Sequence, residues 1–328
     1  MIACRTQIYA WKHIIIAEIS RSGWVIIAWS PRPKYYLTIT WKLVWNMKLH
    51  PFLKITIASV ATLLILLAFA GTYMLTGVMD AVLENSWLFH LNNIVMGSVW
   101  VFVVLKMLRA WEKKGLSDLG IKVKKLDIYL LIASFLISLA FLIGFVAYQG
   151  TQTNVVRIRY ENFWDVRYLM LFGASCLGWA VAAFKEELLS RGFILYQLRD
   201  VNIHKAVAVS AVLFMLIHFP TSGVNPYQAI SWWLGGMLYA YAYVKSGSLM
   251  VSTCLHAIHN FLNELFIGRS SDFSVVILDH PVADVEKLLY ELALKGTLLL
   301  LIFLLYNRKN LGFYRRESHG FTYKKPSK

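Results

Sequence analysis

The chain has 328 residues, of which 58% are hydrophobic and only 16% are charged, and its formal net charge is +15. An ordinary soluble domain is about half apolar and about a quarter charged, and here the apolar residues form long runs, which excludes a soluble globular protein. Lys and Arg collect in the cytoplasmic loops of membrane proteins. The basic balance therefore predicts a lipid bilayer as partner and no nucleic acid.

Residues 1–46 are rich in Trp, Tyr and basic residues and hold a single acidic residue, Glu18. Glu18 and Arg21 interrupt the apolar stretch there, so we expect no membrane span. Two interpretations stay open. The segment lies on the membrane surface as a basic amphipathic piece, or it precedes a natural start at Met47. We treat it as a segment outside the core.

Eight apolar runs follow from residue 55 onward, and we expect each to form a transmembrane helix. They comprise residues 55–79, 86–105, 128–150, 168–184, 206–219, 227–244, 248–263 and 288–306. Pro220 and Pro226 separate the fifth run from the sixth, because proline breaks a helix interior. Glu291 and Lys295 are four apart in the eighth run and can pair.

The expected fold class is all-α, a polytopic membrane bundle of about eight transmembrane helices. Residues 47–310 would form this core and residues 311–328 a basic tail. The connection 106–127 and the stretch 308–328 each hold seven Lys and Arg residues, so both are expected in the cytoplasm. Eight spans with both termini inside satisfy this rule, and we expect a bacterial plasma membrane protein.

Two adjacent carboxylates, Glu186 and Glu187, end the fourth run, where charges are costly unless paired or functional. Glu187 and Arg191 are four apart and share a helix face, so they can form an ion pair. Glu186 points about 100° away from Glu187 and is left without that partner. The alternative is that these residues lie where the helix leaves the membrane and meets water, with no role in a site.

Two further polar pairs lie in later runs, each four residues apart. Phe214 and His218 share a face of the fifth run, and His256 and Asn260 share a face of the seventh. A lone histidine before a proline is more often structural, whereas ionisable groups in mid-membrane are functional candidates. His259 is adjacent to this pair and points elsewhere.

Helix lengths predict that these groups meet. In a tight hairpin that turns at residues 199–204, Glu186 and His218 each lie roughly 20 Å from the turn, at a rise of 1.5 Å per residue. His256 and Asn260 lie about 12 and 18 Å beyond the turn near residue 247, by the same rise. Four polar groups from three helices are therefore expected at similar depth.

The order of three motifs on successive membrane helices resembles a known family. Glu-Glu-x-x-x-Arg at 186–191, Phe-x-x-x-His at 214–218 and His-x-x-x-Asn at 256–260 are similar to the CPBP family, the Abi or CAAX-protease-like intramembrane endopeptidases. Leu-Ser-Asp-Leu-Gly at 116–120 and Gly-Ser-Leu at 247–249 also resemble it. The resemblance covers residues 100–265, roughly half of the chain.

The resemblance implies a catalytic role for four of these residues. Glu186 would be the general base that activates a water molecule, and His218 would assist it or orient the water. His256 and Asn260 would stabilise the oxyanion of the tetrahedral intermediate. The supporting residues would be Glu187, Arg191 and Phe214.

Metal dependence has two readings within this resemblance. Glu186, His218 and His256 could hold a zinc ion with a vacant fourth position, while a water activated by glutamate alone needs none. The chain has no His-Glu-x-x-His motif. We expect no required cofactor, with zinc at these three residues as the alternative.

The expected function is an intramembrane endopeptidase acting on membrane-associated peptides or lipidated proteins. CAAX-type cleavage and processing of leader or bacteriocin-like peptides, with self-immunity, both fall in this class. A non-catalytic membrane scaffold or immunity protein is the main alternative. A transporter is a weaker one, because the chain shows no inverted repeat of broken helices.

Reporter fusions after residues 115, 222, 275 and 320 test the topology. We expect the fusions at 115 and 320 to report the cytoplasm and those at 222 and 275 the opposite side, because basic loops stay inside. Finding 115 and 275 on the same side would contradict eight spans.

Overall fold

A computed structural model describes residues 9–11, 14–16, 49–152, 156–158, 164–267 and 274–306. Internal contacts divide the chain into two units, residues 1–48 and residues 49–328. In the first unit, strands β1 (Tyr9–Trp11) and β2 (Ile14–Ile16) pair antiparallel, with Tyr9 opposite Ile16. The rest of the expected N-terminal segment and the tail 311–328 lie outside the described residues.

Each of the eight apolar runs forms a helix in the second unit. These helices are α2 (Pro51–Thr76), α4 (Ser86–Glu112), α5 (Lys125–Thr151), α6 (Val166–Glu187), α8 (Ile203–Leu216), α10 (Pro226–Ser246), α11 (Leu249–Ile267) and α12 (Asp284–Leu305). Short elements connect them: α3 (Met79–Glu84), the 3₁₀ helix η1 (Leu116–Leu119), the π-helix η2 (Leu188–Ile194), α7 (Leu195–Gln197) and α9 (Phe219–Ser222). Strands β3 (Val156–Ile158) and β4 (Val276–Leu278) pair antiparallel.

Five helices of the described chain are long and apolar enough to cross a membrane: α2, α4, α5, α12 and the continuous helix Val166–Gln197. Helix α8 is apolar but has only 14 residues. The fold is therefore a mostly helical bundle with several membrane-spanning candidates, and the number of eight spans stays a prediction.

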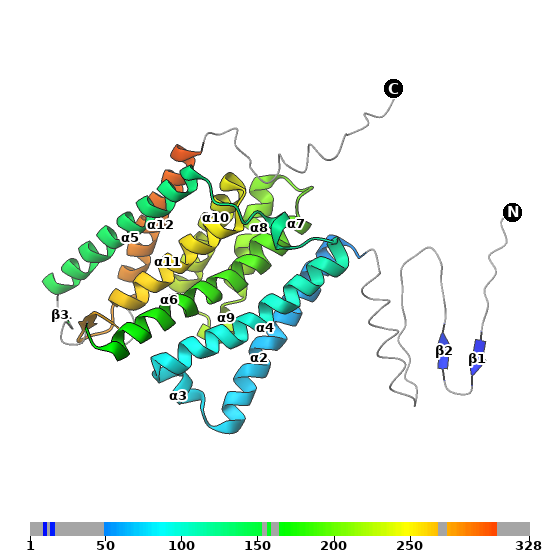
Figure 1. The fold of residues 1–328 in the computed structure, drawn as a ribbon, viewed down its shortest axis with the longest axis horizontal. Helices are drawn as coiled ribbons and strands as arrows, with labels where there is room; N and C mark the ends of the chain where they lie inside the picture. Colours follow the sequence, from blue (N-terminus) through cyan, green and yellow to red (C-terminus); the bar gives the residue numbers. More distant parts are fainter. Residues whose placement is uncertain are drawn as a thin grey trace. The chain divides into compact units, whose positions relative to one another are not determined.

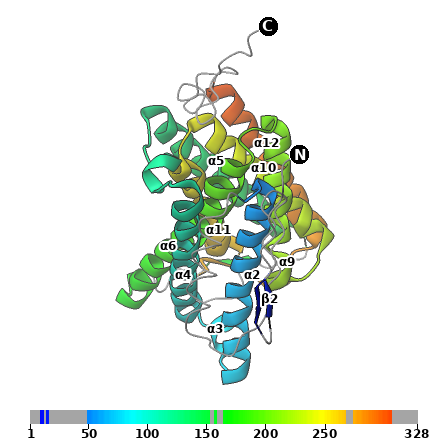
Figure 2. The ribbon, with the colours of Figure 1, turned by 90° about the vertical axis from the view of Figure 1, so that its right-hand side faces the viewer.

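The helices of residues 49–306 pack in two layers (Figures 1 and 2). Across one layer, α2 contacts α4, α4 contacts α6, α6 contacts α11, and α11 contacts α5. In the other layer α8 packs on α10 and α10 on α12, and the layers meet where α10 contacts α11 and α12 contacts α5. Helices α6, α10 and α11 thus lie in the middle of the bundle.

The fifth helix ends earlier than the apolar run predicted. The run extends to Phe219, but α8 stops at Leu216, and Pro220 lies in the first turn of the short helix α9. Proline has no N–H to donate and its ring clashes with the carbonyl four residues earlier, which is that of Leu216. His218 consequently lies in the connection between α8 and α9, one turn beyond Phe214.

The fourth helix, in contrast, does not stop at the paired carboxylates. Helix α6 passes at Glu187 directly into the π-helix η2 and then into α7, which ends at Gln197. All seven residues of η2 are buried, including Arg191 at its centre. A π-helical turn inside an α-helix is rare and is often found at functional sites.

Two loop segments that resemble the CPBP family contact each other. The backbone N–H of Leu249 donates to the carbonyl of Gly120 over 2.7 Å, so η1 and its following glycine dock at the start of α11. Gly120 has φ +77°, and a Cβ there would lie 2.1 Å from the carbonyl oxygen of Gly247. Only glycine satisfies both the left-handed backbone and the close approach.

Replacing this glycine should therefore destabilise the bundle. We expect Gly120→Ala to lower the melting temperature in detergent more than Gly77→Ala does. Gly77 also has a positive φ, of +69°, but a Cβ there would meet nothing within 4 Å. The Gly77→Ala control thus measures the cost of the left-handed backbone alone, which is about 1–2 kcal/mol. Equal melting temperatures for the two variants would show that the contact with Gly247 is unimportant.

Candidate active site

Three side chains from three parts of the chain converge at the end of α6. The Oε2 atom of Glu186 lies 3.6 Å from Nε2 of His218 and 3.8 Å from Nε2 of His256. The Glu186 side chain is 17% exposed, whereas that of His256 is 5% exposed. The structure thus brings together the carboxylate and both imidazoles that the sequence predicted at similar depth.

Hydrogen bonds fix the tautomer of both histidines. Nδ1 of His218 lies 2.7 Å from the carbonyl oxygen of Phe214, and Nδ1 of His256 lies 3.1 Å from Oε1 of Glu187. Because these oxygens can only accept, Nδ1 must carry the proton in each ring. The Nε2 atoms therefore present either a lone pair or a second proton to Glu186.

Aromatic rings hold the two imidazoles in place. His218 stacks on Trp232, with ring centroids 4.9 Å apart, and His256 stacks on Tyr239 at 4.5 Å. Both aromatic residues come from α10, so this helix orients rings that belong to two other parts of the chain. Trp232 and Tyr239 were not predicted from the sequence, because an aromatic residue in a membrane helix is by itself no signal of a site.

The ion pair expected between Glu187 and Arg191 is present and fully buried. Arg191 donates to Oε1 of Glu187 over 2.9 Å and to the backbone carbonyl of Gly236 over 2.7 Å. Its guanidinium carbon lies 4.7 Å from the ring centroid of Phe214, which places Phe214 beside the pair as well as beside His218. Glu187 also accepts from His256, so it positions a residue of the site in addition to bracing the helix.

Asn260 follows His256 by one turn of α11 and is half-buried. Its side chain makes no hydrogen bond to the part of the chain that the structure describes. The geometry therefore joins Glu186, His218 and His256, while the place of Asn260 in the site stays a prediction.

Further polar contacts hold α11 in position. Glu264, two turns beyond His256, lies 3.1 Å from Nε2 of His90 on α4 and accepts from Ser175 and Trp179 on α6 at 2.5 and 2.7 Å. Glu264 thus ties α11 to both α4 and α6.

On the other side of α11, His259 lies 3.4 Å from Glu291, which pairs with Lys295 at 2.9 Å. The spacing of Glu291 and Lys295 predicted their pairing, and His259 points away from Glu186, as expected. Lys295 also donates to the backbone carbonyl of Ser231 in α10, so the network ties α12 to α10 and α11.

The donor types of Glu186, His218 and His256 suit zinc, and these residues would be its ligands. In the segments that the structure describes, however, no group of three His, Cys, Asp or Glu side chains is arranged to hold a metal ion. We therefore derive no chemical step through a metal.

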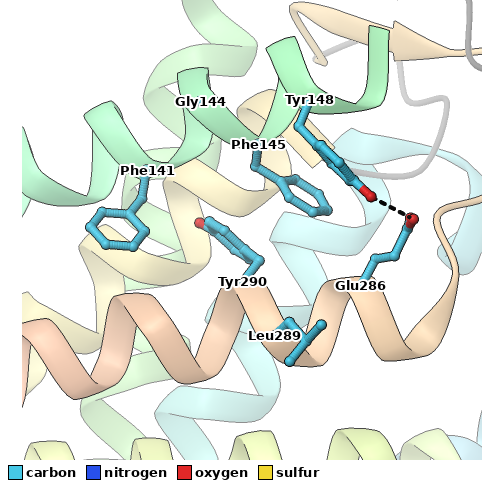
Figure 3. Close-up of a pocket in the computed structure, with 7 residues that line it drawn as sticks. All are labelled: Phe141, Gly144, Phe145, Tyr148, Glu286, Leu289 and Tyr290. Atoms are coloured by element: carbon cyan, nitrogen blue, oxygen red, sulfur yellow. Dashed lines mark hydrogen bonds between the residues drawn. The ribbon is translucent and has the colours of Figure 1, made fainter. Parts of the chain in front are cut away.

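A hollow of about 400 Å³ lies between α5 and α12. It is lined mainly by aromatic side chains, including Phe145 and Tyr290, and Tyr148 donates to Glu286 at one end over 3.3 Å (Figure 3). None of its lining residues belongs to the site around Glu186.

The buried pair makes a stability prediction. Glu187→Gln should lower the melting temperature strongly, because removing one partner of a buried ion pair costs about 3–5 kcal/mol. Glu84→Gln is the control, since Glu84 is exposed on α3 and exposed charges contribute little. A melting temperature for Glu187→Gln equal to that of the control would show that the pair carries no stability.

Comparison with known proteins agrees with this geometry. Residues 167–262 match the family described as type II CAAX prenyl endopeptidase Rce1-like. This stretch contains Glu186, His218, His256 and Asn260. No curated protein matches the chain. The segment that carries the site is thus similar to the Rce1-like type II CAAX prenyl endopeptidases, consistent with the CPBP family that the three motifs indicated.

Proposed function

We propose that the protein is an intramembrane endopeptidase in which Glu186 activates the attacking water. The observation that carries this proposal is the placement of a partly exposed carboxylate 3.6 and 3.8 Å from two imidazole Nε2 atoms, within a bundle of apolar helices. Peptide hydrolysis needs a base for water and groups that stabilise the developing negative charge, and this cluster offers both.

The proposed reaction is a direct hydrolysis. Glu186 takes one proton from water while the water oxygen bonds to the carbonyl carbon. The C–N bond then breaks, and the proton held by Glu186 passes to the leaving nitrogen. The second water proton is lost from the new carboxyl group, which leaves a carboxylate and an amine. His218 orients the water through Nε2, since its Nδ1 is committed to the carbonyl of Phe214.

Stabilisation of the oxyanion is assigned to two residues of α11. His256 can donate from Nε2 when both its nitrogens are protonated, and its Nδ1 is held by the Glu187 carboxylate. Asn260, one turn further along the same helix, would supply a neutral donor. Their shared helix supports the assignment, because donors held on a rigid element need no reorganisation during reaction.

The substrate is proposed to be a membrane-associated peptide or a lipidated protein. The matched family's description favours CAAX-type cleavage, and processing of leader or bacteriocin-like peptides belongs to the same chemistry. The proposal includes eight spans, a bacterial plasma membrane and cytoplasmic termini, in line with the basic segments 106–127 and 308–328. We propose that no metal is required, with zinc at Glu186, His218 and His256 as the alternative.

Glu186→Gln should abolish cleavage and leave the fold intact. Glutamine keeps the shape of the side chain but lacks the basic oxygen, and loss of a general base lowers the rate by about 10²–10⁴-fold. The measurement is cleavage of a membrane-peptide library by purified wild type and variant in detergent, with a melting curve for each.

Glu187→Gln is the matched control, and its folded fraction should retain measurable cleavage. An active Glu186→Gln protein would refute the role of Glu186, and an inactive Glu187→Gln protein with wild-type stability would exchange the two roles. If the wild-type protein cleaves no peptide, the result favours the alternative function of a non-catalytic membrane scaffold or immunity protein. The cleavage assay is repeated with a metal chelator to distinguish the metal-free mechanism from the zinc-dependent one. A zinc-dependent enzyme would lose cleavage with the chelator and recover it when zinc is added.

A further inference from the structure

Lys185 places a buried ammonium group beside the proposed base. Its side chain is only 6% exposed, and Nζ lies 4.0 Å from Oε1 of Glu186. Nζ also lies 5.2 Å from the centroid of the Trp100 ring in α4. The aliphatic stem runs along the α4–α6 contact, where a Cβ on Gly97 would lie 3.6 Å from Cδ of Lys185. The lysine therefore points into the bundle and does not extend toward water.

This ammonium is poorly satisfied within the part of the chain that the structure describes. It has three N–H donors, yet it makes no hydrogen bond there, and Glu186 at 4.0 Å is its one acidic neighbour. A ring face and a carboxylate at that distance compensate a buried charge only in part. A charged group retained in an apolar bundle under these conditions is a candidate for binding an anion.

The position of Lys185 relative to the reaction identifies that anion. The two carboxylate oxygens of Glu186 face different neighbours, since Oε2 faces His218 and His256 while Oε1 faces Lys185. The attacking water becomes an oxygen of the new carboxylate, so hydrolysis creates a negative charge directly beside Glu186. The Glu186 carboxylate and the adjacent product carboxylate repel each other, and a cation near both reduces this repulsion.

We propose that Lys185 binds the carboxylate that cleavage creates on the N-terminal product. The inference rests on the proposed endopeptidase activity. The Lys185 ammonium offers the N–H donors that Glu186 leaves unused. It adds to the donors of α11 as negative charge develops on the carbonyl oxygen, which becomes one of the two oxygens of the product carboxylate. Lys185 is then a further binding residue of the site, specific for a carboxylate and indifferent to a neutral amide.

A second lysine of the bundle provides a matched control. Lys245 on α10 is also buried, and its Nζ lies 5.1 Å from the centroid of the Phe303 ring. It has no ion pair with an acidic residue within the described ranges. Burial over an aromatic ring is therefore not special to Lys185, whereas its place beside Glu186 is.

The test uses the N-terminal product of the library peptide that wild type cleaves best, made with a C-terminal carboxylate and with a C-terminal amide. Inhibition constants of both forms are measured for wild type, Lys185→Met, Lys185→Arg and Lys245→Met, with melting curves. We expect wild type and Lys245→Met to bind the carboxylate about tenfold more tightly than the amide, as a charge-assisted hydrogen bond implies. Lys185→Met should bind both equally and have a lower kcat, and Lys185→Arg should keep part of the preference.

Each outcome decides the inference. Absence of a carboxylate preference in wild type overturns it, as does a preference that survives in folded Lys185→Met. Should Lys185→Met fail to fold, Lys185→Gln replaces it, since glutamine keeps N–H donors but no charge. Failure of the endopeptidase proposal would be recognised separately, because wild type would then cleave no peptide of the library.

Discussion

The buried ion pair of Glu187 and Arg191 is the interaction on which the rest of the site depends. Arg191 also binds the Gly236 carbonyl, and Glu187 also binds His256, so one pair joins α6, η2, α10 and α11. A charge left alone among apolar helices is expensive. The helices that present Glu186, Tyr239 and His256 are therefore held at fixed rotation and depth by the need to keep this pair together.

Two adjacent carboxylates acquire different properties from this arrangement. Consecutive residues point about 100° apart on a helix, which turns Glu187 into the bundle, where it is fully buried and paired. Glu186 is turned away from that pair and stays partly exposed, with imidazoles at 3.6 and 3.8 Å and an ammonium at 4.0 Å. Glu187 is thus fully engaged in the ion pair, whereas Glu186 remains available to act as a base.

Local spacing explains how much of this could be predicted from sequence. The pairs Glu187–Arg191 and Glu291–Lys295 could be found because residues four apart must share a helix face, and helix lengths placed Glu186 level with His218. The bond from His256 to Glu187 spans 69 residues of sequence and depends on the rotation of α11, which spacing does not determine. The rings of α10 and the π-helix were likewise missed, because both arise from packing between helices.

The π-helix gives this region an unusual evolutionary property. An α-helix rotates about 100° per residue, and a π turn accommodates an extra residue in each hydrogen-bonded turn. Losing one residue between 188 and 194 would therefore turn this segment into a regular α-helix and keep Gln197, which donates to Glu112 over 3.1 Å, in register with Glu186. The length of this segment is thus less constrained than the identity of Arg191 within it, whose replacement would leave the buried Glu187 without its partner.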